Sequence, residues 1–181
     1  SIEKLNQALL EGRGIELINI CEARQERKYA CIADEIFWKS KKARIVMMAG
    51  PSSSGKTSSS LRIAQQCKVL GLNPKVIELD NYFVDREFTP KDENGEFDFE
   101  SIDAMDMKLL NEHLNALLRG EEIEIPKFNF VEGRKEPSGK TMKLENNEIL
   151  LMEGIHALNP KLTYAVDQSR IFRIYISALS A

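Results

Sequence analysis

Eight consecutive residues have the types and spacing needed to bind phosphate. From Gly50 to Thr57 the chain reads Gly-Pro-Ser-Ser-Ser-Gly-Lys-Thr, a full match to the pattern GxxxxGK[ST]. The glycines let the backbone curl so that successive N–H groups face phosphate oxygens, Lys56 can reach the β- and γ-phosphates, and the Thr57 hydroxyl can ligate Mg²⁺. An apolar run precedes the loop and a helical pattern follows it, so the positive end of a helix would face the same anion. A serine-rich turn with an incidental lysine would not need this context, and the sequence therefore predicts binding of a nucleoside triphosphate.

The residues expected to contact the nucleotide are those of this loop, except its proline, and the serine that follows it. They are Gly50, Ser52, Ser53, Ser54, Gly55, Lys56, Thr57 and Ser58. The expected ligands are ATP and Mg²⁺, because the loop supplies backbone donors and a cation for phosphates and a hydroxyl for a hard metal ion.

Asp80 is the next residue whose position could do chemistry. It follows directly after a second apolar run, and a carboxylate at the carboxyl end of a strand beside the phosphate loop lies where ligands bind in such sheets. There it could accept a proton from an attacking hydroxyl. A helix cap or turn cap is the alternative role, and position alone leaves both open.

Five blocks of sequence, taken in order, resemble the uridine kinase and phosphoribulokinase family over about 44–176. The blocks are residues 50–57, 80–83, 98–106, 125–130 and 153–155. Together they are far more specific than the phosphate loop alone. The resemblance implies an enzyme that transfers the γ-phosphate of ATP to a sugar hydroxyl, which in uridine kinases is the 5′-hydroxyl of uridine or cytidine.

The resemblance also implies roles for individual residues. Asp80 would be the general base and Lys56 the second catalytic residue, while Glu153 would bind Mg²⁺ together with Thr57, directly or through water. Glu100 falls where these kinases hold the ribose hydroxyls. Three aromatic residues match positions that surround the nucleobase: Phe83, Phe99 and Phe128. An ordinary strand-end carboxylate is the alternative for Glu153, and core packing is the alternative for each phenylalanine.

Two departures from the family pattern bear on the acceptor. Uridine kinases have tyrosine at the positions of Phe83 and Phe128, and a histidine near Gly133 that reads the edge of the pyrimidine. Losing these polar groups removes hydrogen bonds that would discriminate the base. The resemblance still makes a nucleoside acceptor the leading expectation, and these departures favour the alternative, a sugar or sugar-phosphate hydroxyl as in phosphoribulokinases. The reading from a different class is a catalytically weak, nucleotide-binding regulatory module.

The elements that would position these residues follow an alternating pattern. Strands are expected at 44–49, 75–79, 148–153 and 170–176, and helices at about 57–70 and 103–119. This alternation is typical of an α/β fold with a parallel sheet covered on both faces, which the resemblance makes a P-loop NTPase-type sheet with flanking helices. Residues 121–145 are expected to form a β-ribbon insertion. His156 could face the site, with a satisfied structural histidine as the alternative.

The first 43 residues differ from the rest and are expected to form an N-terminal helical appendage or connector. A short helix should end near Gly12 and a longer one should run from about Ile15 to Ser40. The segment 14–36 is similar to the connector that follows a threonyl-tRNA-synthetase-like module in some bacterial kinases, so an upstream synthetase-like domain is one expected partner. Residues 44–181 would form the kinase domain, incomplete at its C-terminus because the arginine-bearing lid of the family is absent.

Composition narrows the class of protein. Lys and Arg number 25 against 28 Asp and Glu, which gives a net charge of −3 and argues against a nucleic-acid partner. No apolar run approaches the roughly 18 residues of a membrane span. Three scattered cysteines indicate reduced thiols in a cytoplasmic protein, with a Cys21–Cys31 disulfide as the minority alternative. The expected partner is a small hydroxylated molecule, and a homo-oligomer is compatible with the sequence.

Overall fold

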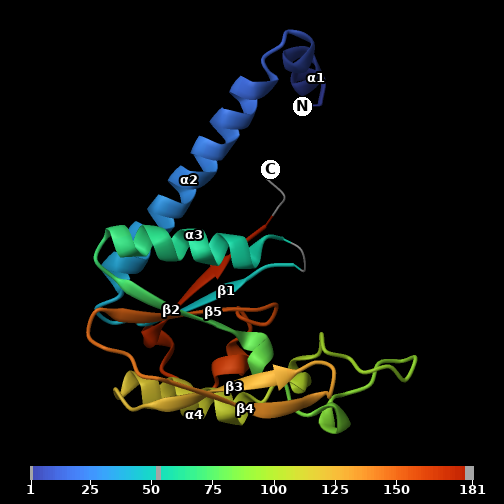
Figure 1. Cartoon of the computed structure of the whole chain (residues 1–181), viewed down its shortest axis with the longest axis vertical. Coiled ribbons are helices and arrows are strands. Elements are labelled where there is room, and N and C mark those ends of the chain that lie inside the picture. The colour runs from blue at the N-terminus through green and yellow to red at the C-terminus, as the bar shows by residue number, and fades with distance from the viewer. Residues whose placement is uncertain (1, 52–53, 178–181) are drawn as a thin grey trace.

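Four parallel strands form the centre of the protein in the computed structural model, which describes residues 2–51 and 54–177. They are β1 (Ile45–Ala49), β2 (Asn73–Glu78), β5 (Glu148–Glu153) and β6 (Ile171–Tyr175), in the order β2-β5-β1-β6 (Figure 1). Both neighbours of β1 run parallel to it, with Met48 opposite Glu153 on one side and Ile174 on the other. The predicted parallel α/β sheet is confirmed.

The central strand β1 is buried on both faces, as its unbroken apolar sequence requires. Side chains alternate along a strand, so Ile45 and Met47 join one hydrophobic cluster while Val46 and Met48 join the other. Two layers therefore pack on the sheet, one on each face. Because the strands are parallel, their carboxyl ends meet at one edge.

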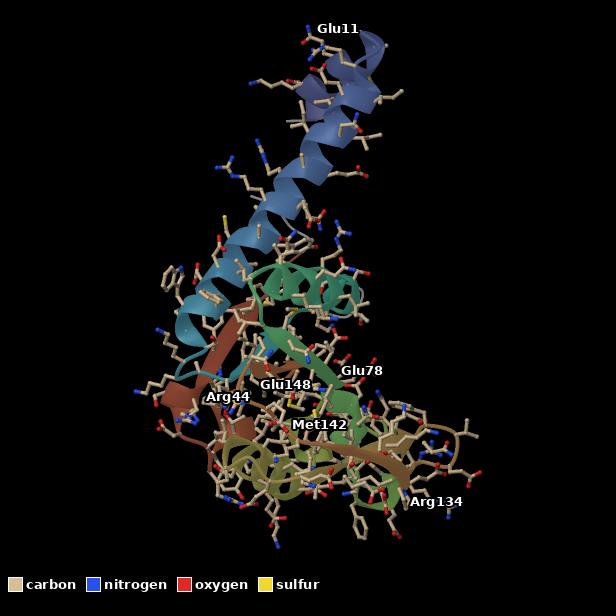
Figure 2. The ribbon with its side chains drawn as sticks, turned by 60° about the vertical axis from the view of Figure 1, so that its left-hand side comes forward. Glu11, Arg44, Glu78, Arg134, Met142 and Glu148 are labelled. Carbon is tan, nitrogen blue, oxygen red and sulfur yellow. The ribbon has the colours of Figure 1, made fainter. Side chains whose placement is uncertain are left out.

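One face is covered by α3 (Lys56–Val69) and by the C-terminal part of α2 (Gly14–Lys39). Three buried residues of α2 make this contact: Tyr29, Ala33 and Ile36. The Tyr29 hydroxyl lies 3.0 Å from Ser59 Oγ of α3. The N-terminal part of α2 projects beyond the sheet and carries α1 (Ile2–Leu10), with Glu11 at the far end (Figures 1 and 2). The domain boundary at residue 43 stays a prediction.

The other face is covered by α4 (Met107–Leu118) and by the predicted ribbon, β3 (Ile123–Asn129) paired antiparallel with β4 (Arg134–Met142). The expected start of α4 near residue 103 is wrong. Asp106 caps the helix by accepting a hydrogen bond from the Leu109 N–H at 3.0 Å, and Ile102–Ala104 form a separate 3₁₀ turn, η3. The other 3₁₀ turns are η1 (Leu79–Tyr82), η2 (Arg86–Phe88), η4 (Pro160–Thr163) and η5 (Gln168–Arg170).

The cysteines are free, and the minority disulfide alternative is wrong. Cys21 and Cys31 lie ten residues apart on α2, and a helical rise of about 1.5 Å per residue separates them by roughly 15 Å, far beyond disulfide reach. Of the helices within the described residues, none has the length and apolar character needed to cross a membrane.

Candidate functional site

The phosphate loop connects β1 to α3 at the carboxyl edge of the sheet. Gly50 is buried there, and a Cβ at this position would lie 2.7 Å from Ser54 Oγ and closer still to the carbonyl oxygen of Ile176. The loop is therefore folded tightly against the end of β6, where the Ile176 N–H donates to the Ala49 carbonyl at 2.7 Å. Only glycine fits this approach. Gly55 has a φ of 80°, in the left-handed region, and leads into α3.

The first turn of α3 presents hydrogen-bond donors to the space inside this loop. Lys56 and Thr57 open the helix, and its first N–H groups have no partner within the helix. Lys56 Nζ reaches back over the loop and donates to the Pro51 carbonyl at 2.8 Å. Ser54 Oγ is buried without a hydrogen-bond partner among the described residues. Backbone donors, a lysine and a spare hydroxyl fit a phosphate chain; Ser52 and Ser53, also expected to contact it, lie outside the described residues.

Carboxylates gather at the same edge. Glu153 ends β5 and lies directly beside Glu78 of β2. Figure 2 shows Glu78 at the carboxyl end of β2. Asp80 lies two residues after the end of β2, inside the 3₁₀ turn η1. Glu153 is only 5% exposed, its Oε2 has no partner in the described part of the chain, and the nearby Thr57 hydroxyl lowers the pKa of its carboxyl group.

The pKa values of two carboxyl groups at this edge are raised, mainly by burial. Burial raises the pKa of Glu153, and the negative charges of Glu78 and Asp80 raise it further. The Thr57 hydroxyl and the positive charge of Lys56 act in the opposite direction. Asp80 has an exposed surface, yet the protein around its carboxyl group displaces enough water to raise its pKa. Glu78 raises it further, while Lys56 and His156 oppose. The edge thus holds more negative charge than its cations balance.

A divalent cation of the Mg²⁺ type fits this donor set. The Thr57 hydroxyl and the Glu153 carboxylate are hard oxygen donors close enough for Thr57 to lower the pKa of Glu153, and Mg²⁺ is commonly held by one or two protein oxygens plus substrate phosphates and water. Residues 2–51 and 54–177 contain no group of three or more His, Cys, Asp or Glu side chains arranged as a metal site. The phosphates would therefore supply the remaining ligands.

The predicted aromatic residues do come together. The ring centroids of Phe83 lie 5.2 Å from Phe99 and 5.6 Å from Phe128. Sequence reasoning missed a fourth ring, Phe130, which lies 5.0 Å from Phe128 and 6.1 Å from Phe83. Phe83 and Phe128 belong to the buried core, whereas Phe130 is 57% exposed. These four residues are called the phenylalanine cluster below.

Other site candidates fall in different surroundings. Glu100 is exposed beside the cluster and its backbone N–H donates to Asp98 at 2.9 Å, so its ribose role stays a prediction. His156 Nε2 is buried and has no hydrogen-bond partner in the described chain, which differs from a satisfied structural histidine. Sequence reasoning also missed Glu78, although a second acidic residue just before Asp80 was a usable signal.

The position of Gly133 is filled from another part of the chain. Gly133 has a φ of 67°, and a Cβ there would lie 2.5 Å from Arg86 Nε and 2.6 Å from its Cζ. The Arg86 side chain therefore occupies the space that a side chain at residue 133 would need. Glycine here is a packing requirement of this chain.

Comparison with known proteins places this geometry in a family. The model of the Phosphoribulokinase / Uridine kinase family matches residues 45–180. A uridine kinase from Chloroflexus aurantiacus is 34% identical over 111 residues, covering 61% of this chain and 51% of the relative. One from Lactobacillus helveticus is 32% identical over 120 residues, covering 66% and 56%. The chain spans about half the length of the curated relatives it matches.

A solved structure has the same fold. A protein described as a possible uridine kinase from Bacillus stearothermophilus superposes with a TM-score of 0.65 at 20% identity, covering 85% of this chain and 80% of that one. The family match spans the sheet, the phosphate loop and the carboxylate edge alike. This chain belongs to the phosphoribulokinase and uridine kinase family.

Proposed function

We propose that this protein is an ATP- and Mg²⁺-dependent kinase that transfers the γ-phosphate to a hydroxyl of a nucleoside. The observation that carries the proposal is the meeting of three features at one edge of the sheet. These are the donor-lined loop with Lys56, the neighbouring Thr57 hydroxyl and Glu153 carboxylate, and the Asp80 carboxylate beyond them. Phosphoryl transfer is catalysed mainly by positioning and by neutralising charge, and this edge offers groups for both.

In the proposed reaction Asp80 takes the proton of the acceptor hydroxyl. The hydroxyl oxygen forms a bond to the γ-phosphorus as the bond to the β,γ-bridging oxygen breaks, and ADP leaves. The raised pKa of Asp80 makes its carboxylate a stronger base than a freely solvated aspartate. Lys56 and the N–H groups of the α3 first turn hold the phosphates. Thr57 and Glu153 would hold Mg²⁺, which supplies charge neutralisation on the phosphate oxygens.

The nucleoside class is supported by the phenylalanine cluster. Phe130 and the half-buried Phe99 border the buried pair Phe83 and Phe128 and offer apolar ring surface to a flat base. Stacking of a base on aromatic rings is worth about 1–3 kcal/mol per base. The matched relatives named as uridine kinases favour the same class.

Acceptor-dependent ADP release tests the proposal. The full-length protein would be given Mg²⁺-ATP with each member of a panel of nucleosides, sugars and sugar phosphates. Turnover is expected with nucleosides and should fall at least about 100-fold in Lys56→Ala and in Asp80→Asn, in line with losses of key charge-stabilising and proton-transfer groups. Turnover only with sugar phosphates would favour a phosphoribulokinase-like acceptor. Tight ATP binding without any acceptor-dependent turnover would favour a regulatory nucleotide-binding module.

A further inference from the structure

Arg86 is fixed at the edge of the phenylalanine cluster by the turn of the β3–β4 ribbon. One guanidinium N–H donates to the Phe130 carbonyl at 2.6 Å, and the Arg86 backbone N–H donates to the Gly133 carbonyl at 2.7 Å. The side chain rests on Gly133, with no Cβ between them. Its orientation is thus set by three contacts with one turn of four residues.

Asp85, the residue before Arg86, also holds the ribbon close to this turn. Asp85 Oδ1 accepts a hydrogen bond from the Lys135 backbone N–H at 2.8 Å. Asn129 Oδ1 closes the turn from inside by accepting from the N–H groups of Val131 and Glu132 at 3.0 and 3.1 Å. Arg86 therefore belongs to a preorganised clamp, and its head group does not need to be ordered when a ligand arrives.

The charge of Arg86 has no acidic partner within the described chain. The ion pairs found among residues 2–51 and 54–177 involve other residues, and the guanidinium makes a single hydrogen bond there, to Phe130. Arg86 is nevertheless half-buried. Guanidinium N–H groups are donors only and never acceptors. Arg86 is thus a half-buried cation with unused donors next to the exposed ring of Phe130. A ligand that carries an oxygen atom could accept hydrogen bonds from those donors.

We infer that Arg86 is a specificity-determining residue that selects nucleosides whose base carries a carbonyl oxygen, and not an amino group, at C4 of a pyrimidine or C6 of a purine. The inference rests on the proposed function, since it assumes a base on the phenylalanine cluster. A carbonyl oxygen accepts from the guanidinium, whereas an amino group would place donor against donor and leave both unpaired. Uridine over cytidine and inosine over adenosine are the pairs that differ in this way.

The test is the ratio of kcat/KM for uridine to that for cytidine in the full-length protein. The wild type should favour uridine by at least about fivefold, the lower end of what one good hydrogen-bonding contact to a base edge provides. Arg86→Gln keeps a polar group that can both donate and accept, and the ratio should fall to within about threefold of unity. Inosine and adenosine should repeat the pattern as a second pair.

Asp85→Ala is the matched control. It removes the 2.8 Å contact between Asp85 and the Lys135 backbone but neither of the hydrogen bonds that Arg86 makes to Phe130 and Gly133, so it should lower kcat/KM for both nucleosides by the same factor. Arg86→Lys keeps a cation that can only donate hydrogen bonds, so this variant should retain a preference for uridine. It is the variant to measure if Arg86→Gln does not fold.

The outcomes separate this inference from the proposed function. Equal use of uridine and cytidine by the wild type would overturn the role of Arg86 while leaving nucleoside phosphorylation intact. A uridine preference that survives unchanged in Arg86→Gln, or that vanishes equally in Asp85→Ala, would overturn it as well. Absence of turnover with every nucleoside would instead refute the proposed function itself.

Discussion

Replacing Gly50 with alanine should weaken nucleotide binding and also lower the free energy of unfolding. The added Cβ would lie 2.7 Å from Ser54 Oγ and closer still to the backbone carbonyl oxygen of Ile176, whereas ordinary contacts begin at 3.4 Å. The loop and the end of β6 must therefore separate by more than about 0.7 Å, and a misplacement on this scale can cost roughly 100-fold in rate. Overpacking of this kind costs about 1–3 kcal/mol in the free energy of unfolding.

Gly71→Ala is the control for the general cost of removing a glycine. Gly71 has a φ of 86° and open space where its Cβ would be, and it lies at the opposite end of α3 from the phosphate loop. This variant should lose roughly 1 kcal/mol from backbone strain and keep its affinity for ATP. Calorimetric titration with Mg²⁺-ATP and urea unfolding of both variants make the comparison. Native ATP affinity in Gly50→Ala would refute the tight-loop reasoning.

Three further predictions concern Glu153, Asp106 and the cysteines. The pKa of Glu153 is raised in the folded protein, so its ionised carboxylate lowers the free energy of unfolding above that pKa, and this destabilisation disappears as pH falls through it. Glu153→Gln should therefore raise Tm near neutral pH, by an amount that shrinks in acid. Activity should fall in the same variant. An unchanged Tm near neutral pH would contradict the cost assigned to this carboxylate. Asp106 caps α4 and pairs with Lys135, so Asp106→Ala should cost about 1–2 kcal/mol in urea unfolding, and an unchanged midpoint would contradict the cap. Burial raises the pKa of the Cys67 thiol to about 11, so a thiol reagent at pH 8 should modify the two exposed cysteines quickly and Cys67 only on unfolding; three equal rates would contradict this.

Much of the nucleotide end of the site could be predicted because its signals are local. The phosphate loop is a contiguous pattern, and the apolar runs around it indicate where the parallel strands end. Asp80 and Glu153 each come directly at or after such an end, so topology alone brings them to one edge.

The acceptor end was less predictable because it depends on contacts between distant segments. Phe130 joins the cluster only because the ribbon turn folds back onto residues 83–86. Nothing in the sequence near Gly133 indicates that Arg86, 47 residues earlier, fills its side-chain space. The start of α4 was misjudged because Asp103 and Asp106 are both plausible caps, and the separate turn at Ile102–Ala104 decides between them.

Direct detection of the transferred phosphate tests the central proposal most sharply. The full-length protein would be incubated with Mg²⁺, ATP labelled in its γ-phosphate and a nucleoside, and the product would be identified by mass. The account predicts a labelled nucleoside monophosphate, formed by the wild type and absent with Asp80→Asn. Label found only in inorganic phosphate, or product formed equally well without the Asp80 carboxylate, would contradict it.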